Sequence, residues 1–168
     1  MKISPKSPEY RGYCGIGLHL PKCAANVGSV LRAAWCWDAS FIAITGKRYK
    51  KSSVDTMATY RHKPLFHVDD LKSIIPYDCV SVAVEINGDA MNLVDFVHPE
   101  RAFYIFGPED GSLGVKQFGW CDRVVCIPAG CLNLAASVNV LLYDRRFKQR
   151  DRPTIRATDG TCDSRNVR

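Results

Sequence analysis

A chain of 168 residues that is 46% hydrophobic can bury one substantial core, and it is too short for two domains of ordinary size. No apolar run approaches the roughly 18 to 20 residues needed to cross a bilayer, and residues 1–12 show no apolar signal core, so we expect a cytoplasmic protein without a membrane span. The formal net charge of +6 is unevenly spread, which favours a polyanionic partner.

Short β-rich runs alternate with helical patterns along the chain. The runs expected to form strands are residues 13–19, 41–45, 79–86, 102–107 and 123–128. Between the first two, Ala24 to Trp37 has apolar residues at the spacing of one helix face, and Leu132 to Arg150 predicts a long final helix. Shorter helices are expected at 52–60, 69–75 and 113–119. Buried runs that alternate with helices indicate an α/β fold, with a mostly parallel sheet and helices on both faces.

The chain is expected to form a single domain over residues 1–150, followed by a basic polar tail over residues 151–168. Apolar residues nearly vanish after Phe147, so the final segment lacks the material for a core. We expect this tail to be extended or mobile unless a partner orders it.

The cysteines and histidines show no pattern of a metal site. The eight cysteines form no C-x-x-C pair and mostly sit within apolar runs, which favours reduced, buried thiols over disulfides or zinc. The four histidines are scattered without the spacing of metal ligands, so no metal is predicted.

Two segments carry most of the positive charge. Residues 46–63 contain six Lys or Arg against one Asp, and residues 145–168 contain eight against three acids, so each segment nets +5. Clustered Lys and Arg form the electrostatic footprint of nucleic-acid binding. The alternative is solvated surface charge and a loose tail.

The segments that follow the predicted strands are the places to look for a ligand site in an open α/β sheet. These segments are Glu85 to Gly88, Gly107 to Gly114 and Pro128 to Asn133. The second lacks the G-K-[ST] of a P-loop and the G-x-G-x-x-G of a dinucleotide fold, and Glu109 and Asp110 would repel phosphate. An acidic loop suits a cationic ligand or one rich in donors, although a tight turn built on Pro108 and the glycines is an alternative.

Several polar residues within or at the start of helices have both a structural and a functional interpretation. Arg32, within the first predicted helix, is either an arginine with its stem packed down or a functional guanidinium. Asn26 and Asn133 stand near helix starts, where capping is the simpler explanation, and Cys131 is equally a small buried thiol. No G-x-S-x-G elbow is present, which argues against a common serine hydrolase.

Three segments become specific when they are taken together. They are "NVGSVLRAA" (26–34), "FGPEDGSLG" (106–114) and "IPAGCLNLAASVNVLLYDR" (127–145). In this order and after strands, they resemble the SpoU/TrmH-like family of the SPOUT superfamily, which are S-adenosylmethionine-dependent RNA ribose 2′-O-methyltransferases. The resemblance spans about residues 13 to 147. It implies a parallel sheet whose C-terminal part is threaded into a trefoil knot, an exception to the rule against threaded chains.

The resemblance also implies the residues of the site. Those that would hold the methyl donor, largely through main-chain groups, are Val84, Glu85, Gly107, Ile127, Cys131, Leu132 and Leu134. Arg32 matches the family's catalytic arginine. The polar positions around it match Asn26, Glu109 and Asn133. A carboxylate from Glu109 or Glu85 is expected near the positive sulfonium of the donor.

A ribose 2′-hydroxyl is a poor nucleophile until its proton leaves, whereas the sulfonium methyl needs only in-line approach at short range. A guanidinium stays protonated, so Arg32 is expected to orient the adjacent phosphate and stabilise the developing alkoxide, with proton abstraction as the alternative. The chain departs from the family in one loop. The "AGC" between Ile-Pro and Leu-Asn is shorter than usual, and Cys131 stands at the position of a serine.

The implied partners are RNA, either tRNA or rRNA, and a second copy of the chain, because family members are homodimers with the site near the interface. Candidate RNA contacts are Lys47, Arg48, Lys50, Lys51, Arg145 and Arg146. Two alternatives to ribose methylation stay open. One is a knotted RNA-binding protein without catalysis, and the other is an enzyme that methylates a base nitrogen, although "NVGSVLR" favours ribose.

Overall fold

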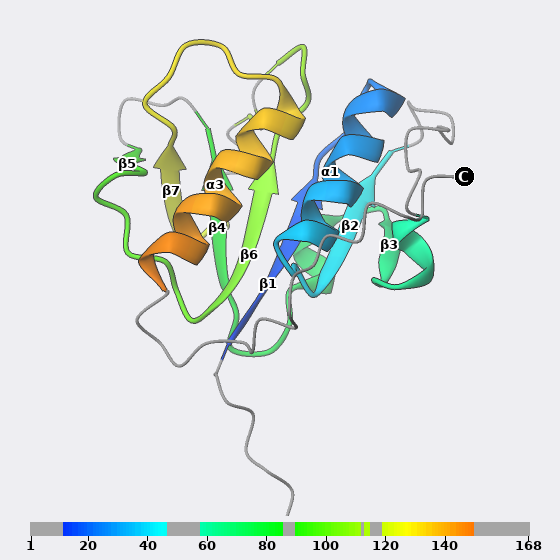
Figure 1. Ribbon diagram of the computed structural model, residues 1–168, viewed down its shortest axis with the longest axis horizontal. Helices are drawn as coiled ribbons and strands as arrows, with labels where there is room; N and C mark the ends of the chain where they lie inside the picture. Colours follow the sequence, from blue (N-terminus) through cyan, green and yellow to red (C-terminus); the bar gives the residue numbers. More distant parts are fainter. Residues whose placement is uncertain (1–11, 47–57, 86–89, 112, 115–118, 150–168) are drawn as a thin grey trace, which may run out of the picture.

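The computed structural model describes residues 12–46, 58–85, 90–111, 113–114 and 119–149. At its centre is a seven-stranded sheet in the order β3-β2-β1-β6-β4-β7-β5, with neighbouring strands parallel throughout (Figure 1). The strands are β1 (Tyr13–Leu18), β2 (Phe41–Thr45), β3 (Leu65–Val68), β4 (Val80–Val84), β5 (Met91–Asn92), β6 (Arg101–Phe106) and β7 (Arg123–Cys126). The predicted α/β class with a mostly parallel sheet is confirmed.

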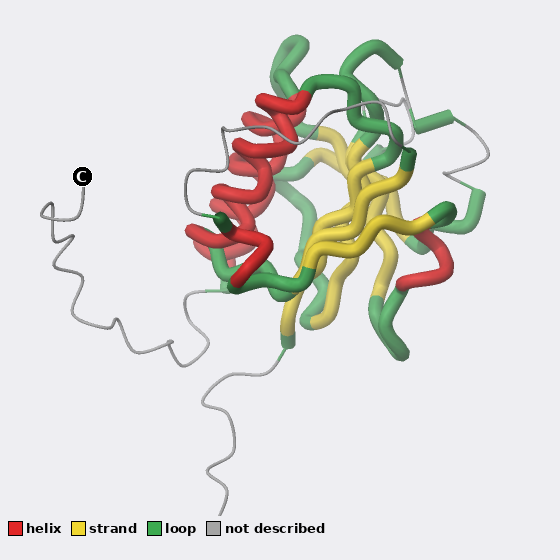
Figure 2. Tube along the Cα trace, turned by 90° about the vertical axis from the view of Figure 1, so that its right-hand side faces the viewer, coloured by secondary structure: helices red, strands yellow, loops and turns green. Residues whose placement is uncertain are grey.

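Two α-helices, α1 (Ala24–Cys36) and α3 (Leu134–Lys148), lie side by side on one face of the sheet (Figures 1 and 2). The 3-10 helix η2 (Leu71–Ile74) and the segment around Trp120 pack on the opposite face. A second 3-10 helix, η1 (Thr59–Arg61), packs beside α1. Because both faces are covered, the central strands are mostly apolar, and every residue of β2 is buried.

The predicted strands and long helices are present, with small shifts at their ends. The last helix begins at Leu134 rather than Leu132, because the Asn133 side chain caps it. Sequence reasoning missed β3 and β5, which are short strands at the two edges of the sheet. The predicted helix 69–75 is the short 3-10 helix η2, whereas most of 52–60 and 113–119 lies outside the described residues.

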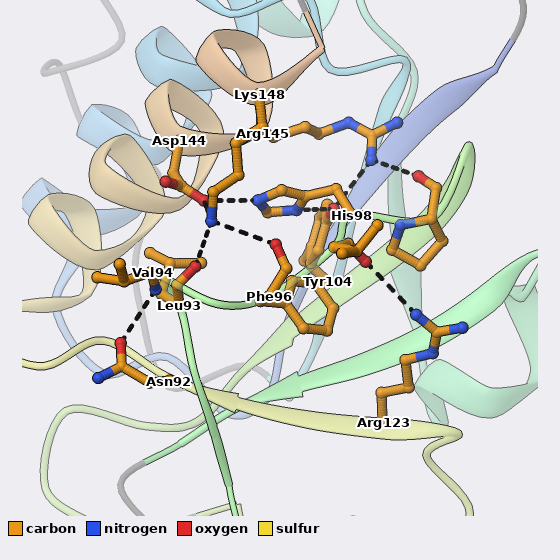
Figure 3. A network of polar contacts seen from close by, with 12 residues as sticks. Asn92, Leu93, Val94, Phe96, His98, Tyr104, Arg123, Asp144, Arg145 and Lys148 are labelled. Carbon is orange, nitrogen blue, oxygen red and sulfur yellow. Dashed lines mark hydrogen bonds and ion pairs between the residues drawn. The ribbon is translucent and has the colours of Figure 1, made fainter.

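A buried polar network joins the C-terminal half of α3 to the segment between β5 and β6 (Figure 3). His98 lies at its centre, with Nδ1 2.7 Å from Tyr104 Oη and Nε2 2.8 Å from Asp144 Oδ2. Lys148 Nζ is 2.8 Å from the same carboxylate and also donates to the Phe96 carbonyl oxygen. The network thereby anchors α3 to the chain that enters the central strand β6.

Arg145 belongs to the same network, and the residue is only 7% exposed. The guanidinium donates to the carbonyl oxygens of Pro99 and Glu100 at 2.6 and 2.8 Å and to Tyr104 Oη at 2.9 Å. These internal contacts of the two terminal guanidinium nitrogens do not favour the predicted contact of Arg145 with RNA, which stays a prediction. Its neighbour Arg146 is exposed and stays a predicted RNA contact.

The stability of the fold is expected to depend on pH through His98. Burial lowers the pKa of His98 to about 4, despite the hydrogen bond to Asp144. The unfolded chain binds this proton near pH 6.5 and the folded chain only near pH 4, so the stabilisation is complete above this window and is lost as pH falls through it. We expect the free energy of unfolding in urea to fall by up to about 3 kcal/mol as the pH is lowered through this window, and we expect His98→Gln to lack this fall. Equal losses in both proteins would contradict this assignment.

Candidate active site

A cavity of about 170 Å³ opens at the carboxyl ends of β4, β6 and β7. These three strands are neighbours in the sheet, so the loops that follow them meet at one edge, the usual place for a ligand in an open parallel sheet. The lining residues are Val84, Glu85, Phe106, Gly107, Pro108, Glu109, Gly111, Ile127, Gly130, Cys131, Leu132, Leu134 and Ser137.

All of the residues predicted to hold the methyl donor belong to this lining. They are Val84, Glu85, Gly107, Ile127, Cys131, Leu132 and Leu134. Their role as donor contacts stays a prediction. Sequence reasoning missed Ser137, whose place in the first turn of α3, four residues after Asn133, was the available signal.

Glu109 connects the loop after β6 to the start of α1. Its Oε2 accepts the main-chain N–H of Lys22 at 2.8 Å, and its Oε1 accepts the N–H of Cys23 at 3.1 Å and the amide of Asn26 at 3.0 Å. The N-cap residue Cys23 offers no side-chain cap, so Glu109 supplies the negative charge that the amino end of a helix favours. Two of the predicted polar site residues, Asn26 and Glu109, are thus in direct contact.

The hydrogen bonds also keep Glu109 ionised. Burial by itself raises the pKa of its carboxyl, but the bonds from Asn26 and from the N–H groups of Lys22 and Cys23 outweigh burial and hold the pKa below its ordinary value. The carboxylate is therefore charged at neutral pH, and it orders one wall of the cavity.

Glu109→Gln is expected to loosen this connection. The glutamine amide keeps one acceptor oxygen, but its NH2 group faces main-chain N–H donors that the carboxylate accepted. We therefore expect the free energy of unfolding in urea to fall by roughly 1–3 kcal/mol. The matched control is Asp110→Asn, which removes an exposed ion pair with Lys22 and is expected to cost less than about 1 kcal/mol. Equal losses in the two variants would contradict the proposed connection.

Glu85, the other candidate carboxylate, also has a main-chain partner. Its Oε2 accepts the N–H of Leu113 at 2.8 Å, which joins the loop after β4 to the loop after β6. Glu85 therefore connects the loop after β6 to the end of β4, whereas Glu109 connects the same loop to the start of α1. Both residues line the cavity.

Asn133 acts as a helix cap. Its Oδ1 accepts the N–H of Ala136 at 2.7 Å, and the Ser137 hydroxyl donates to the Asn133 carbonyl oxygen at 3.1 Å. The residue is exposed and does not line the cavity, so the contacts are those that capping requires. A catalytic role for Asn133 stays a prediction.

Arg32 is exposed on α1, and no residue of α1 lines the cavity. The candidate catalytic arginine and the candidate donor cavity of one chain are thus separate features. Four of the predicted RNA contacts, Lys47, Arg48, Lys50 and Lys51, lie outside the described residues, as does the basic tail.

The part of the chain that the structure describes contains no group of three or more His, Cys, Asp or Glu placed to hold a metal ion. The same part contains no helix long and apolar enough to cross a bilayer. The cysteines in this part, seven of the eight, are free thiols.

The chain is similar to a known family and to solved structures of RNA-modifying enzymes. The model of the SpoU rRNA Methylase family matches residues 15–143. The SpoU methyltransferase AviRb from Streptomyces viridochromogenes is 22% identical, with a TM-score of 0.74 over 86% of this chain and 63% of that chain. The A. aeolicus TrmH/SpoU tRNA modifying enzyme is 15% identical, with a TM-score of 0.75 over 88% of this chain and 83% of that chain.

A third similar structure comes from work on the 2-OH methylation of C/U34 on tRNA. It is 21% identical, with a TM-score of 0.73 over 84% of this chain and 99% of that chain. AviRb has also been solved in complex with the cofactor AdoMet, and the chain spans less than two thirds of its length. No curated protein matches the chain. At these identities the similarity to solved structures shows the fold, and the trefoil knot stays a prediction.

Proposed function

The chain belongs to the SpoU rRNA Methylase family, and from this we propose that it transfers a methyl group from S-adenosylmethionine to a ribose 2′-hydroxyl of RNA. The family match confirms the resemblance predicted from the three segments. The observation that carries the proposal is the cavity beyond β4, β6 and β7, which gathers all seven predicted donor contacts. The AdoMet complex of the related AviRb supports the choice of donor.

The proposed RNA is a tRNA, with rRNA as the alternative. The A. aeolicus relative is a tRNA modifying enzyme, and another similar structure concerns methylation of tRNA, whereas the family description names rRNA. A cytoplasmic location is part of the proposal, because free thiols suit a reducing compartment.

The residues of the chain fit a cationic methyl donor. S-adenosylmethionine, when bound, supplies an electrophilic methyl on a positive sulfonium. Glu85 and Glu109 both line the cavity and favour a cation there, while the loops offer main-chain groups and apolar side chains. In this proposal Arg32 holds the phosphate beside the target ribose and stabilises the developing alkoxide as the hydroxyl approaches in line. The carbon–oxygen bond replaces the carbon–sulfur bond, the donor leaves as a neutral thioether, and the hydroxyl proton passes to solvent water.

We also propose that the site is completed in a homodimer. Arg32 does not line the cavity of its own chain, and the family resemblance implies a site near an interface. On α3 an outward apolar stripe is formed by Val140, Tyr143 and Phe147, which are 39%, 55% and 45% exposed. Residues at this spacing share one helix face, and such a stripe favours burial against a second copy.

Tyr143→Glu is expected to convert the homodimer to a monomer, because the new carboxylate would be buried without a partner in the interface. Sedimentation velocity measures the change. The control is Tyr77→Glu, at a loop residue that is 95% exposed, which is expected to leave the dimer intact. A wild-type chain that sediments as a monomer would count against the dimer.

The function is tested by incubating the chain with total tRNA or total rRNA and labelled donor, followed by nuclease digestion and mass analysis of nucleosides. We expect a 2′-O-methylnucleoside in the tRNA pool. A methylated base instead would replace the proposed reaction with base methylation. RNA binding without donor binding in calorimetry would indicate an RNA-binding protein without catalysis, the alternative that the short "IPAGCLN" loop motivates.

A further inference from the structure

An exposed aromatic and basic surface lies where η1 and the residues after it pack against the C-terminal half of α1. The His62 ring lies 4.8 Å from the Trp35 ring at an angle of 55°, and Lys63 Nζ is 6.0 Å from the Trp35 ring centre. Beside them, the Arg61 guanidinium lies 5.8 Å from the centre of the Tyr60 ring. These five residues form what we call the aromatic–basic surface.

Four of the five members of this surface are exposed, and the fifth, Lys63, is half-buried. Trp35 and Tyr60 are 37% and 40% exposed, and Arg61 and His62 are also exposed. Lys63 forms an ion pair with Asp38, just after the end of α1. The positive charge beside the Tyr60 ring comes from Arg61. In the sequence, residues 46–63, which include Tyr60 to Lys63, net +5, although residues 47–57 lie outside the part that the structure describes.

The aromatic–basic surface also begins next to the proposed catalytic residue. Arg32 precedes Trp35 by three residues on α1, and residues three apart are neighbours on a helix surface. Both residues are exposed. A ligand with one group bound at Arg32 can therefore place its neighbouring group on the Trp35 ring.

Exposed rings beside cations suit an unpaired nucleobase and its phosphate. A base stacks on an aromatic face whatever its identity, and a guanidinium pairs with the phosphate next to it. Duplex RNA keeps its bases stacked on one another, so it cannot use the rings in this way. The excess of positive charge favours a nucleic acid over a polypeptide partner.

We propose that the aromatic–basic surface binds the single-stranded stretch of RNA beside the methylated nucleotide. Unpaired bases stack on Tyr60 and Trp35, and Arg61 holds a phosphate between them. The inference rests on the proposed function and adds to it a preference for an unpaired substrate region.

The test is fluorescence anisotropy of the full chain with a labelled single-stranded RNA of twelve nucleotides and with a duplex of equal length. Tyr60→Ala is expected to weaken single-strand binding about 5- to 100-fold with an unchanged salt dependence, because it removes one stacked base. Arg61→Ala is expected to lower the slope of log affinity against log salt by about 0.7, because it removes one phosphate contact. The control Tyr77→Ala is expected to bind as the wild type does.

Several results would overturn the inference. They are equal affinity of the wild type for single strand and duplex, unchanged affinity in Tyr60→Ala and Arg61→Ala, and an equal loss in Tyr77→Ala. If Tyr60→Ala dissociates the homodimer and keeps its RNA affinity, the surface is a protein interface instead. The proposed function is measured separately, by methylation of total tRNA and rRNA, so the two failures are distinguishable. Circular dichroism and urea unfolding of each variant verify that it is folded, whether or not the chain binds the donor.

Discussion

Replacing Arg32 by alanine is expected to slow methyl transfer about 10²- to 10³-fold while leaving the affinity for S-adenosylmethionine unchanged. Arg32 does not line the cavity of its own chain, so its truncation removes no donor contact there. In the proposed mechanism it removes the charge that faces the phosphate and the developing alkoxide, an interaction strongest in the transition state. The side chain is exposed on α1 and alanine is a good helix former, so the fold is expected to persist.

The measurement is single-turnover methylation of the RNA pool, with donor affinity from calorimetry. Arg123→Ala is the matched control, because Arg123 is also exposed but begins β7 at the amino end of the strand, opposite the cavity. It is expected to keep the wild-type rate. Arg32→Lys keeps the charge but lacks the planar guanidinium, so its rate is expected to lie between those of Arg32→Ala and the wild type. A wild-type rate in Arg32→Ala would remove Arg32 from the mechanism.

Replacing Arg145 by methionine is expected to lower the free energy of unfolding by about 3–5 kcal/mol. The change leaves the carbonyl oxygens of Pro99 and Glu100 and the Tyr104 hydroxyl without this donor in the interior. Methionine keeps the length of the apolar stem, so little of the loss comes from packing. Because a domain is stable by only roughly 5–15 kcal/mol, this is a large fraction of the total.

Urea unfolding measures this loss, and the neighbour on α3 is the control. Arg146→Met changes an exposed side chain and is expected to stay within about 0.5 kcal/mol of the wild type. If Arg145→Met does not fold, Arg145→Lys keeps the charge with fewer donors and is expected to show a smaller loss. Equal stability of Arg145→Met and the wild type would contradict the anchoring role of the network.

Local patterns in the chain were sufficient for the class of fold and for the loops that line the cavity. Apolar runs that alternate with helical periodicity indicate a parallel sheet, and such a sheet brings the carboxyl ends of its strands to one edge. Glu85, Gly107 and Ile127 each occupy the last or second-last position of a predicted strand. Their meeting in one cavity follows from this topology, without knowledge of any side-chain packing.

Packing, by contrast, settled which charged and polar residues face inward. Arg145 looked like a surface cation within a basic run, yet the inward face of α3 buries it against carbonyl oxygens. The contact between Asn26 and Glu109 joins residues 83 positions apart, and no local pattern specifies such a pair. Burial and hydrogen-bond partners depend on which helix face meets the sheet, which is a long-range property. The sequence pattern therefore predicted where the cavity lies, whereas the tertiary contacts determined which polar residues support it.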